Sequence, residues 1–541
     1  MTLKTGSNSA ILEVENLSVA LPGGLDRAYA VDNVSLTVKR REITCVVGES
    51  GSGKSVTASV VMGLLPDALR VVQGSVRLDG EDITNASVSR MNSLRGNRMA
   101  MIFQEPLTAL NPVVRLGDQI AEVLQLHRPS MSSVDIRKRV IELMADVHLP
   151  DPEEMYKRYP HQISGGQRQR VTIAMALAME PALIIADEPT TALDVTTQAQ
   201  ILLLFRELLQ KHDSGILMIT HDFGVVADVA DHVTVMKQGK TVESGLPDQI
   251  IGNPQHPYTR ELIAAVPRFQ YLPPSDANSS VVLQASDLRL TYRQKGWLRK
   301  KQEVTALDGV SLSVSRGETL GIVGESGSGK STFAKAVLGF EQPDSGSIFF
   351  KGKDMLAIDT ATLTRVRHRI QMIFQDPYSS LNPRRTIGQS LTEGPVRHGK
   401  SKVDAVHRAR ELLEQVGLLP SAMERFPHEF SGGQRQRICI ARALALEPDV
   451  IVADEAVSAL DVTVQAQVLE LLQSLQRELG FSMFFITHDL RVASNICNYI
   501  AVMSKGQVVE TGTAKQVFQS PRHDYTRRLL AALPGSELQA N

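Results

Sequence analysis

The sequence predicts an α/β protein made of two copies of one domain, each built on a buried parallel sheet. Three observations support this prediction. A set of motifs occurs twice in the same order, short apolar runs end in glycine or acidic residues, and segments with helical periodicity separate these runs. Apolar runs of this kind are typical of strands that helices cover on both faces.

The internal repeat defines the domains. The chain repeats VVGESGSGKS as IVGESGSGKS, IFQEPLTALNP as IFQDPYSSLNP, SGGQRQR unchanged, ADEPTTALDVTTQAQ as ADEAVSALDVTVQAQ, and ITHDF as ITHDL. Between the copies, RFQYLPPSDANSS is rich in Pro, Ser and Asn and has no apolar period, so it is predicted to be a linker. We therefore predict a first domain over residues 1–267, a linker over 268–280 and a second domain over 281–541.

Composition narrows the classes of partner. The 541 residues are 43% apolar and 22% charged, as in an ordinary globular protein. The 58 Lys and Arg residues do not exceed the 59 Asp and Glu residues, so no nucleic-acid partner is expected. The 3 cysteines are too few for a disulfide framework and indicate a reducing compartment. The N-terminus is polar and no apolar run approaches the length of about 18 residues that a membrane span needs. We therefore expect a cytoplasmic chain that reaches a membrane only by docking.

The first repeated motif predicts a phosphate-binding loop. GESGSGKS follows the apolar run Ile43–Val47 and fits the pattern G-x-x-x-x-G-K-[ST]. Its glycines let backbone N–H groups turn toward a phosphate, its lysine neutralises the β- and γ-phosphates, and its serine ligates Mg²⁺. A chance loop is the alternative for a single match, and the repetition argues against it. The predicted loops are Gly48, Glu49, Ser50, Gly51, Ser52, Gly53, Lys54 and Ser55, and Gly324, Glu325, Ser326, Gly327, Ser328, Gly329, Lys330 and Ser331.

Two apolar runs, ALIIADE and DVIVADE, end in an Asp-Glu pair. Asp187 and Asp454 are predicted to hold Mg²⁺, and Glu188 and Glu455 to polarise the attacking water. A helix N-cap is the alternative reading of such a pair, and it loses weight when a phosphate loop precedes the pair.

A histidine and a glutamine complete each predicted centre. His221 and His488 follow strands at the edge where open α/β sheets bind ligands, so we expect them to contact the γ-phosphate. Gln104 and Gln375 follow MIF runs and are expected to reach Mg²⁺ and the attacking water. Alone, either residue type is structural more often than catalytic.

The motif SGGQRQR predicts a second anion site in each half. Its Ser-Gly-Gly opens a helical segment, so a hydroxyl, free N–H groups and the positive helix end come together. The simplest account is that each domain uses this site to bind the nucleotide held by the other domain, in a head-to-tail pair. The residues concerned are Ser164, Gly165 and Gly166, and Ser431, Gly432 and Gly433.

As a set, these motifs resemble those of the ABC ATPase family, from residue 11 to residue 530. The resemblance implies two P-loop NTPase domains, each with a RecA-like parallel-sheet core, an antiparallel β subdomain and a helical subdomain. It also implies ATP and Mg²⁺ as cofactors and hydrolysis of ATP to ADP and phosphate, coupled to transport. Two composite sites follow: Lys54, Ser55, Gln104, Asp187, Glu188 and His221 with Ser431–Gly433, and Lys330, Ser331, Gln375, Asp454, Glu455 and His488 with Ser164–Gly166.

Adenine binding is one point where the halves differ. In the family an aromatic side chain stacks on adenine, and Tyr292 fits this role in the second half. Leu21 stands at the matching position of the first half, which puts stacking there in doubt unless Tyr29 supplies the ring.

The sequence at the end of each half resembles one particular group within this family. NPQHPYTRELIAAVP and SPRHDYTRRLLAALP resemble the C-terminal tails of oligopeptide, dipeptide and nickel importer ATPases, and the short fused form is similar to microcin C and glutathione-type peptide importer ATPases. This implies an ATPase subunit of a peptide importer at the cytoplasmic face of the inner membrane. Its partners would be integral-membrane permease subunits, which dock on the helical subdomain, and indirectly a periplasmic or extracellular substrate-binding protein. No cysteine follows either tail, so the iron–sulfur site of many such proteins is not expected.

The alternative is a twin-cassette ATPase that acts on ribosomes or DNA. Such proteins share the catalytic motifs, but the ribosomal ones have a long charged helical linker and the DNA-repair ones have zinc cysteines. This chain has neither feature. The sequence does not name the cargo, because other chains select it.

Overall fold

Helical segments return the chain to the same edge of a sheet after each strand, so short apolar strands pair in parallel. The computed structural model describes residues 9–24, 27–191, 193–274, 279–293, 303–458 and 460–535. By its internal contacts the chain forms two units, Met1–Val266 with Leu533–Asn541, and Pro267–Ala532.

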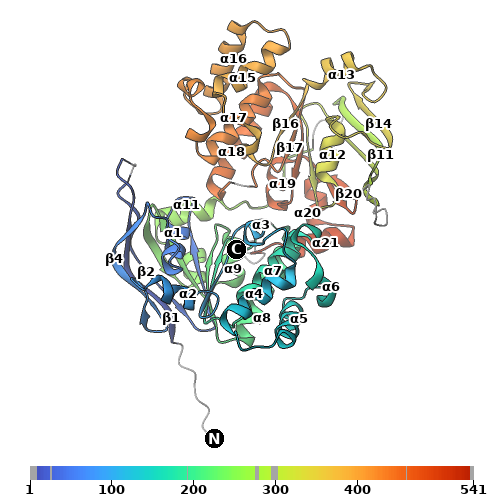
Figure 1. Ribbon diagram of the computed structural model, residues 1–541. Helices are drawn as coiled ribbons and strands as arrows, with labels where there is room; N and C mark the ends of the chain where they lie inside the picture. Colours follow the sequence, from blue (N-terminus) through green and yellow to red (C-terminus); the bar gives the residue numbers. More distant parts are fainter. Residues whose placement is uncertain are drawn as a thin grey trace. The chain divides into compact units, whose positions relative to one another are not determined.

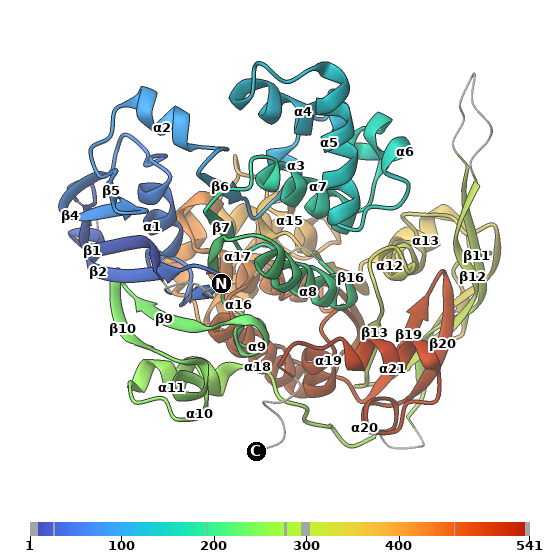
Figure 2. The same cartoon turned by 90° about the horizontal axis from the view of Figure 1, so that it is seen from below.

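The first unit contains a six-stranded sheet and a four-stranded antiparallel sheet. In the larger sheet only one edge strand, β10, runs antiparallel to its neighbour. Its order is β10 (Lys240–Gly245), β9 (His232–Lys237), β3 (Ile43–Val47), β8 (Gly215–Ile219), β7 (Leu183–Asp187) and β6 (Met99–Ile102). The order of the smaller sheet is β2 (Tyr29–Lys39), β1 (Ala10–Ala20), β4 (Arg70–Leu78) and β5 (Glu81–Asp82), and Figure 2 shows these strands beside α1.

The second unit repeats this topology. Its six-stranded sheet has the order β16 (Ile370–Ile373), β17 (Val450–Asp454), β18 (Ser482–Thr487), β13 (Thr319–Val323), β19 (Tyr499–Ser504) and β20 (Gln507–Thr513). Its antiparallel sheet has the order β12 (Glu303–Ser315), β11 (Val281–Arg293), β14 (Ser345–Phe350) and β15 (Lys353–Asp354).

Helices follow the strands in the same sequence in both units. In the first unit they are α1 (Lys54–Val61), α2 (Val88–Leu94), α3 (Pro106–Ala109), α4 (Leu116–His127), α5 (Ser133–Asp146), α6 (Pro152–Lys157), η1 (Pro160–Gln162), α7 (Gly165–Leu177), α8 (Val195–Lys211), α9 (Phe223–Val229), α10 (Pro247–Gly252) and α11 (Pro257–Ala265). In the second unit they are α12 (Lys330–Val337), α13 (Thr360–Arg367), α14 (Pro377–Ser380), α15 (Ile387–Arg397), α16 (Lys402–Gln415), η2 (Pro420–Glu424), η3 (Pro427–Glu429), α17 (Gly432–Leu444), α18 (Val462–Leu479), α19 (Leu490–Ile496), α20 (Ala514–Gln519) and α21 (Asp524–Ala531).

Each unit has three parts: a core with the mostly parallel sheet, an antiparallel sheet and a group of helices. In the second unit, α15 and α16 lie on one side of β16 and β17, and the antiparallel strands β11 and β14 lie on the other (Figure 1). The strands β3 and β13 are buried along their whole length, as the predicted parallel core requires. The predicted α/β architecture, with a parallel core, an antiparallel β part and a helical part, is therefore confirmed in both units.

The segment that follows α11 makes specific contacts within the second unit. The ring of Phe269 lies 5.5 Å from that of Phe518, and the backbone N–H of Gln270 donates to Asn495 Oδ1 at 3.1 Å. The side chain of Asn498 donates to the carbonyl of Pro273 at 2.9 Å. The first part of the predicted linker thus packs against the second unit. Residues 275–278 of the linker lie outside the described residues.

Candidate active sites

The first glycine-rich loop joins β3 to α1 and has little room for side chains. Gly48 has a φ of 151°, and a Cβ there would collide with the carbonyl oxygen of Met236. Gly53 has a φ of 102°, and a Cβ there would lie 2.6 Å from the carbonyl oxygen of Ala30. The loop therefore depends on glycine both for its left-handed backbone and for its close packing.

The lysine of each loop is buried and bound to its own backbone. Lys54 Nζ donates to the carbonyls of Gly48 and Glu49 at 2.7 and 2.9 Å. Lys330 Nζ donates to the two equivalent carbonyls at 2.7 and 2.8 Å. Each ammonium group lies in the mouth of the loop, where it can bind an incoming phosphate.

An aspartate at the end of a core strand meets the serine of each loop. Ser55 Oγ lies 3.3 Å from Asp187 Oδ1, and Ser331 Oγ lies 3.3 Å from Asp454 Oδ1. Burial raises the pKa of both aspartates above the ordinary value, although the serine hydroxyls oppose this. In the described part of the chain no group of three or more His, Cys, Asp or Glu side chains could hold a metal ion. A hydroxyl and a carboxylate side by side nevertheless fit Mg²⁺, which takes few protein ligands when phosphates and water supply the rest.

Glu188 lies at the centre of a hydrogen-bond network. Gln104 Nε2 donates to its Oε2 at 2.8 Å, Thr191 Oγ1 donates to the same oxygen at 3.0 Å, and His221 Nδ1 lies 3.2 Å from its Oε1. Burial would raise the pKa of Glu188, but its hydrogen bond to His221 and the charge of that residue outweigh burial and lower the pKa. Burial likewise opposes the shift at His221, whose pKa the same contact raises. The carboxylate is thus held in its charged form.

The second half has the same arrangement with one change. Gln375 Nε2 donates to Glu455 Oε2 at 2.8 Å, and His488 Nδ1 lies 3.5 Å from Glu455 Oε1. Ser458 occupies the position of Thr191, but its hydroxyl donates to the backbone carbonyl of Glu455 at 3.0 Å. The structure thus brings these Ser, Gln, Asp, Glu and His side chains close to the loop lysine within each unit.

The SGG motifs begin helices α7 and α17, as predicted. Ser164 Oγ accepts a hydrogen bond from the Gln167 backbone N–H at 3.3 Å, and the Gln167 side chain accepts from the Ser164 N–H at 3.1 Å. Ser431 makes the same capping box with Gln434. Each serine hydroxyl keeps its own hydrogen available to donate to an anion.

The two positions discussed for adenine differ in exposure. Tyr292, near the end of β11, is 38% exposed, as a stacking platform must be. Leu21 instead packs against the apolar cluster of the antiparallel sheet. Tyr29, hydrogen-bonded into the neighbouring strand opposite Ala20, is 40% exposed.

Two further residues of the sites were not found by sequence reasoning. The hydroxyl of Tyr258, on α11, accepts the backbone N–H of Glu49 at 3.2 Å, and the hydroxyl of Tyr525, on α21, accepts that of Glu325 at 3.0 Å. Each tail therefore supports a phosphate loop. The available signal was the repeated Tyr-Thr-Arg in both tails.

With this geometry established, comparisons with known proteins identify the family. The family model for the ABC transporter matches residues 31–191 and 307–458. The chain belongs to the ABC transporter family. The model for the oligopeptide/dipeptide transporter C-terminal region matches residues 242–277 and 509–539 of this ABC protein.

Full-length relatives agree with this assignment. The glutathione import ATP-binding protein GsiA of Shigella dysenteriae serotype 1 (strain Sd197) is 48% identical over 562 residues, which cover 97% of this chain and 90% of that protein. The proteins of the same name from Escherichia coli O157:H7 and Escherichia coli (strain K12) are 48% and 47% identical with the same coverage. The predictions of two ABC ATPase domains, of ATP hydrolysis that drives transport and of the oligopeptide importer group are confirmed. As an ABC ATPase the chain binds ATP and works within a transporter complex.

Proposed function

We propose that this protein is the ATP-binding subunit that energises the import of glutathione or similar short peptides. The observation that carries the proposal is that both cassettes keep a full set of hydrolytic side chains and both end in a peptide-transporter tail. The 48% identity to a glutathione import ATPase along 97% of the chain supports glutathione or a similar peptide as cargo.

In the proposed mechanism each side chain has one task. Lys54 and Lys330, held at their loop carbonyls, bind the β- and γ-phosphates of ATP with their remaining N–H donors. Ser55 with Asp187, and Ser331 with Asp454, would hold Mg²⁺, which neutralises phosphate charge when bound. Gln104 and Gln375 would lie beside both the ion and the attacking water.

Glu188 and Glu455 then polarise the attacking water, because their charged form is the one that accepts its proton. His221 and His488 hold these carboxylates and donate to the γ-phosphate. The capped ends of α7 and α17, Ser164–Gly166 and Ser431–Gly433, bind phosphate during hydrolysis through hydroxyl and backbone N–H groups. Tyr292 would stack on adenine in the second cassette.

We also propose the organisation in which this subunit acts. Its domains would be residues 1–267 and 281–541, joined by the linker at 268–280. Among the described helices, none is long and apolar enough to cross a membrane. The subunit would dock peripherally, through its helical parts, on permease subunits at the cytoplasmic face of the inner membrane. A periplasmic or extracellular binding protein would act on it indirectly, and no nucleic acid would take part.

The test is reconstitution of this chain in lipid with the permease subunits encoded by the adjacent genes. ATPase activity would be measured for the chain alone, then with permease, then with a binding protein loaded with glutathione or with a dipeptide. We expect the rate to rise at each step, because the partners bias closure of the sites. Equal rates in all three conditions would contradict the importer role. Stimulation by ribosomes or DNA instead would favour the other class of twin-cassette ATPase.

A further inference from the structure

The second unit contains a cavity far from its nucleotide site. It has a volume of about 580 Å³, within the usual range for small-molecule sites. Pro448 and Asp449, directly before β17, and Phe481, directly before β18, line it. The cavity therefore lies at the amino ends of the core strands, whereas the catalytic groups lie at the carboxyl ends. The five residues of β17 separate the two edges by roughly 15 Å.

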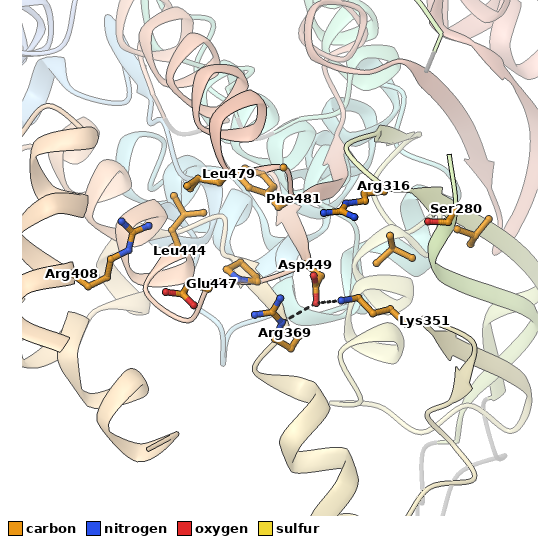
Figure 3. Close-up of a pocket in the computed structure, with 14 residues that line it drawn as sticks. Ser280, Arg316, Lys351, Arg369, Arg408, Leu444, Glu447, Asp449, Leu479 and Phe481 are labelled. Atoms are coloured by element: carbon orange, nitrogen blue, oxygen red, sulfur yellow. Dashed lines mark hydrogen bonds and ion pairs between the residues drawn. The ribbon is translucent and has the colours of Figure 1, made fainter. Parts of the chain in front are cut away.

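Four cationic side chains from three parts of the unit line this cavity: Arg316, Lys351, Arg369 and Arg408. Figure 3 shows Lys351 and Arg369 reaching the carboxylate of Asp449, each at 2.8 Å, with Arg316 on the side of Ser280 and Arg408 on the side of Leu444. Only one further carboxylate, that of Glu447, lines the cavity, and it binds Lys400 at 2.5 Å. The lining therefore has an excess of positive charge.

Two of the cations keep hydrogen-bonding capacity. Nε of Arg408 is buried and has no hydrogen-bond partner in the structure, while its guanidinium contacts Glu411 at 3.1 Å. The guanidinium of Arg316 forms no ion pair with a described residue, because the two carboxylates of the cavity bind Lys351, Arg369 and Lys400 instead. A buried donor without an acceptor is costly, so an anionic ligand at Arg408 Nε would stabilise this arrangement, and the exposed Arg316 is open to the same ligand from solvent.

The first unit provides an internal comparison, because backbone hydrogen bonds identify equivalent positions. Arg40 N–H donates to the Ser9 carbonyl as Arg316 N–H does to that of Ser280. Asp79 N–H donates to the Ile11 carbonyl as Lys351 N–H does to that of Val282. Asp213 and Gly480 each stand two residues before a matching core strand, β8 and β18.

At these positions the first unit pairs each arginine with a carboxylate. Arg40 contacts Asp79 at 2.7 Å and Asp213 at 3.0 Å, Asp79 also binds Arg98, and Asp213 also binds Arg41. In the second unit Lys351 replaces Asp79 and Gly480 replaces Asp213, while Asp449 stands where the first unit has Ala182 and binds Lys351 and Arg369. Arg316 is therefore left without the partners that Arg40 has, and a further cation is added beside it.

We propose that this cavity binds a small organic anion with two or more acidic groups, carboxylate or phosphate. Guanidinium groups bind both acids with paired hydrogen bonds. The separation of Arg316 from Arg408 across the cavity favours a ligand with an acidic group at each end. The buried side chains Val282, Leu444 and Phe481 form an apolar wall, which favours an organic ligand over an inorganic ion.

Calorimetry on the full chain tests the site, with one molecule of ADP supplied per cassette and no Mg²⁺, because excess ADP is itself an anion of the proposed class. The probes are citrate for polycarboxylates, 3-phosphoglycerate for organic phosphates, and sulfate as an inorganic control. We expect one molecule of citrate or of 3-phosphoglycerate to bind per chain, and the preferred probe identifies the acid group. Binding should weaken by at least about tenfold in Arg316→Ala.

A matched pair of variants guards against misfolding. The double variant Lys351→Asp with Asp449→Ala gives the second unit the residues that the first unit has, Asp79 and Ala182, so it should keep the melting temperature and abolish probe binding. Arg40→Ala, at the equivalent position of the first unit, should bind the probes like the parent. The proposal is overturned if no organic probe binds, if sulfate binds as tightly as the organic probes, or if the double variant binds them unchanged. It concerns binding alone, so its outcome is independent of the transport role.

Discussion

The nucleotide sites lie at the carboxyl-end edges of the two core sheets, and their distances can be compared one by one. Lys54 Nζ lies 2.7 and 2.9 Å from its loop carbonyls, and Lys330 Nζ lies 2.7 and 2.8 Å from the equivalent pair. At the opposite edge of the sheets the units differ: Arg40 contacts two carboxylates, and Arg316 has none among the described residues. A shared ligand, ATP, restricts the first edge in both units. The anion that we propose would bind the other edge in the second unit alone, which agrees with the different charges found there.

Smaller differences lie inside the nucleotide sites themselves. Thr191 donates to the carboxylate of Glu188 at 3.0 Å, whereas Ser458 lies 3.0 Å from the backbone carbonyl of Glu455 and makes only a minor contribution to lowering the pKa of that carboxyl. The His–Glu contact is 3.2 Å in the first unit and 3.5 Å in the second. The two sites therefore contain the same types of side chain, but the hydrogen bonds that hold the glutamates differ slightly. Variants made in pairs, one in each unit, can measure the effect of these differences.

The largest expected effect comes from Glu188 and Glu455, the carboxylates that we propose to polarise the attacking water. We expect Glu188→Gln and Glu455→Gln to slow hydrolysis at their own sites by about 10²-fold each, because the amide cannot take the proton of the attacking water. The double variant should lose activity and retain bound ATP. Steady-state ATPase assays measure this, with the exposed Glu15→Gln as control. A single variant as active as the parent would break the equivalence of the two sites.

The tail tyrosines should have equal effects in the two units. Tyr258→Phe or Tyr525→Phe removes the acceptor of a loop N–H, a loss of about 1 kcal/mol, so ATP affinity at that site should fall about fivefold. Site-resolved nucleotide binding measures this, and Tyr499→Phe, in β19, serves as control. Unchanged affinity in both variants would show that the tails do not support the loops.

The residue at the adenine-stacking position should give the two units different nucleotide affinities. Tyr292→Leu should weaken ATP binding in the second unit several-fold and Leu21→Tyr should strengthen it in the first, because stacking contributes on the order of 1 kcal/mol. The measurement is the preference for ATP over GTP at each site. Equal preference in the parent would indicate that Tyr29 already supplies a ring in the first unit.

The smallest effect concerns pH. The lowered pKa of Glu188 stabilises the fold above the ordinary value of 4.5, and this is lost as pH falls through the lowered pKa. The raised pKa of His221 stabilises the fold below the ordinary value of 6.5, and this is lost as pH rises through the raised pKa. The pair is thus most stabilising between these two values.

His221→Gln should therefore lower the melting temperature more at about pH 5.5 than at about pH 8.5, for a contribution of up to about 1 kcal/mol. His488→Gln should show the same trend with a smaller amplitude, since its contact with Glu455 is longer. If the variants lower the melting temperature by the same amount at both pH values, the histidines act by packing and not by charge.

The sequence predicts best what short contiguous segments determine. Gly48–Ser55 and the Asp-Glu pair specify their chemistry within a few residues, and the capping boxes at Ser164 and Ser431 follow from local pattern. The support of Glu49 by Tyr258 joins residues 209 positions apart, so it requires the tertiary fold. The charged cavity likewise draws its lining from separate turns and helices, and no motif contains it.

The bonds of Lys54 to its loop have a consequence for experiments that remove this lysine. By donating to Gly48 and Glu49 from six and five residues along the chain, the ammonium group closes a small non-covalent ring before nucleotide arrives. The entropy of closing that ring is therefore lost during folding and not during ligand capture. A Lys54→Met chain would lose the phosphate contact and also open the ring, which should appear as faster hydrogen exchange at the amides of Gly51 and Ser52. Its weakened nucleotide binding would then measure two losses at once, whereas in Ser55→Ala the ring would stay closed.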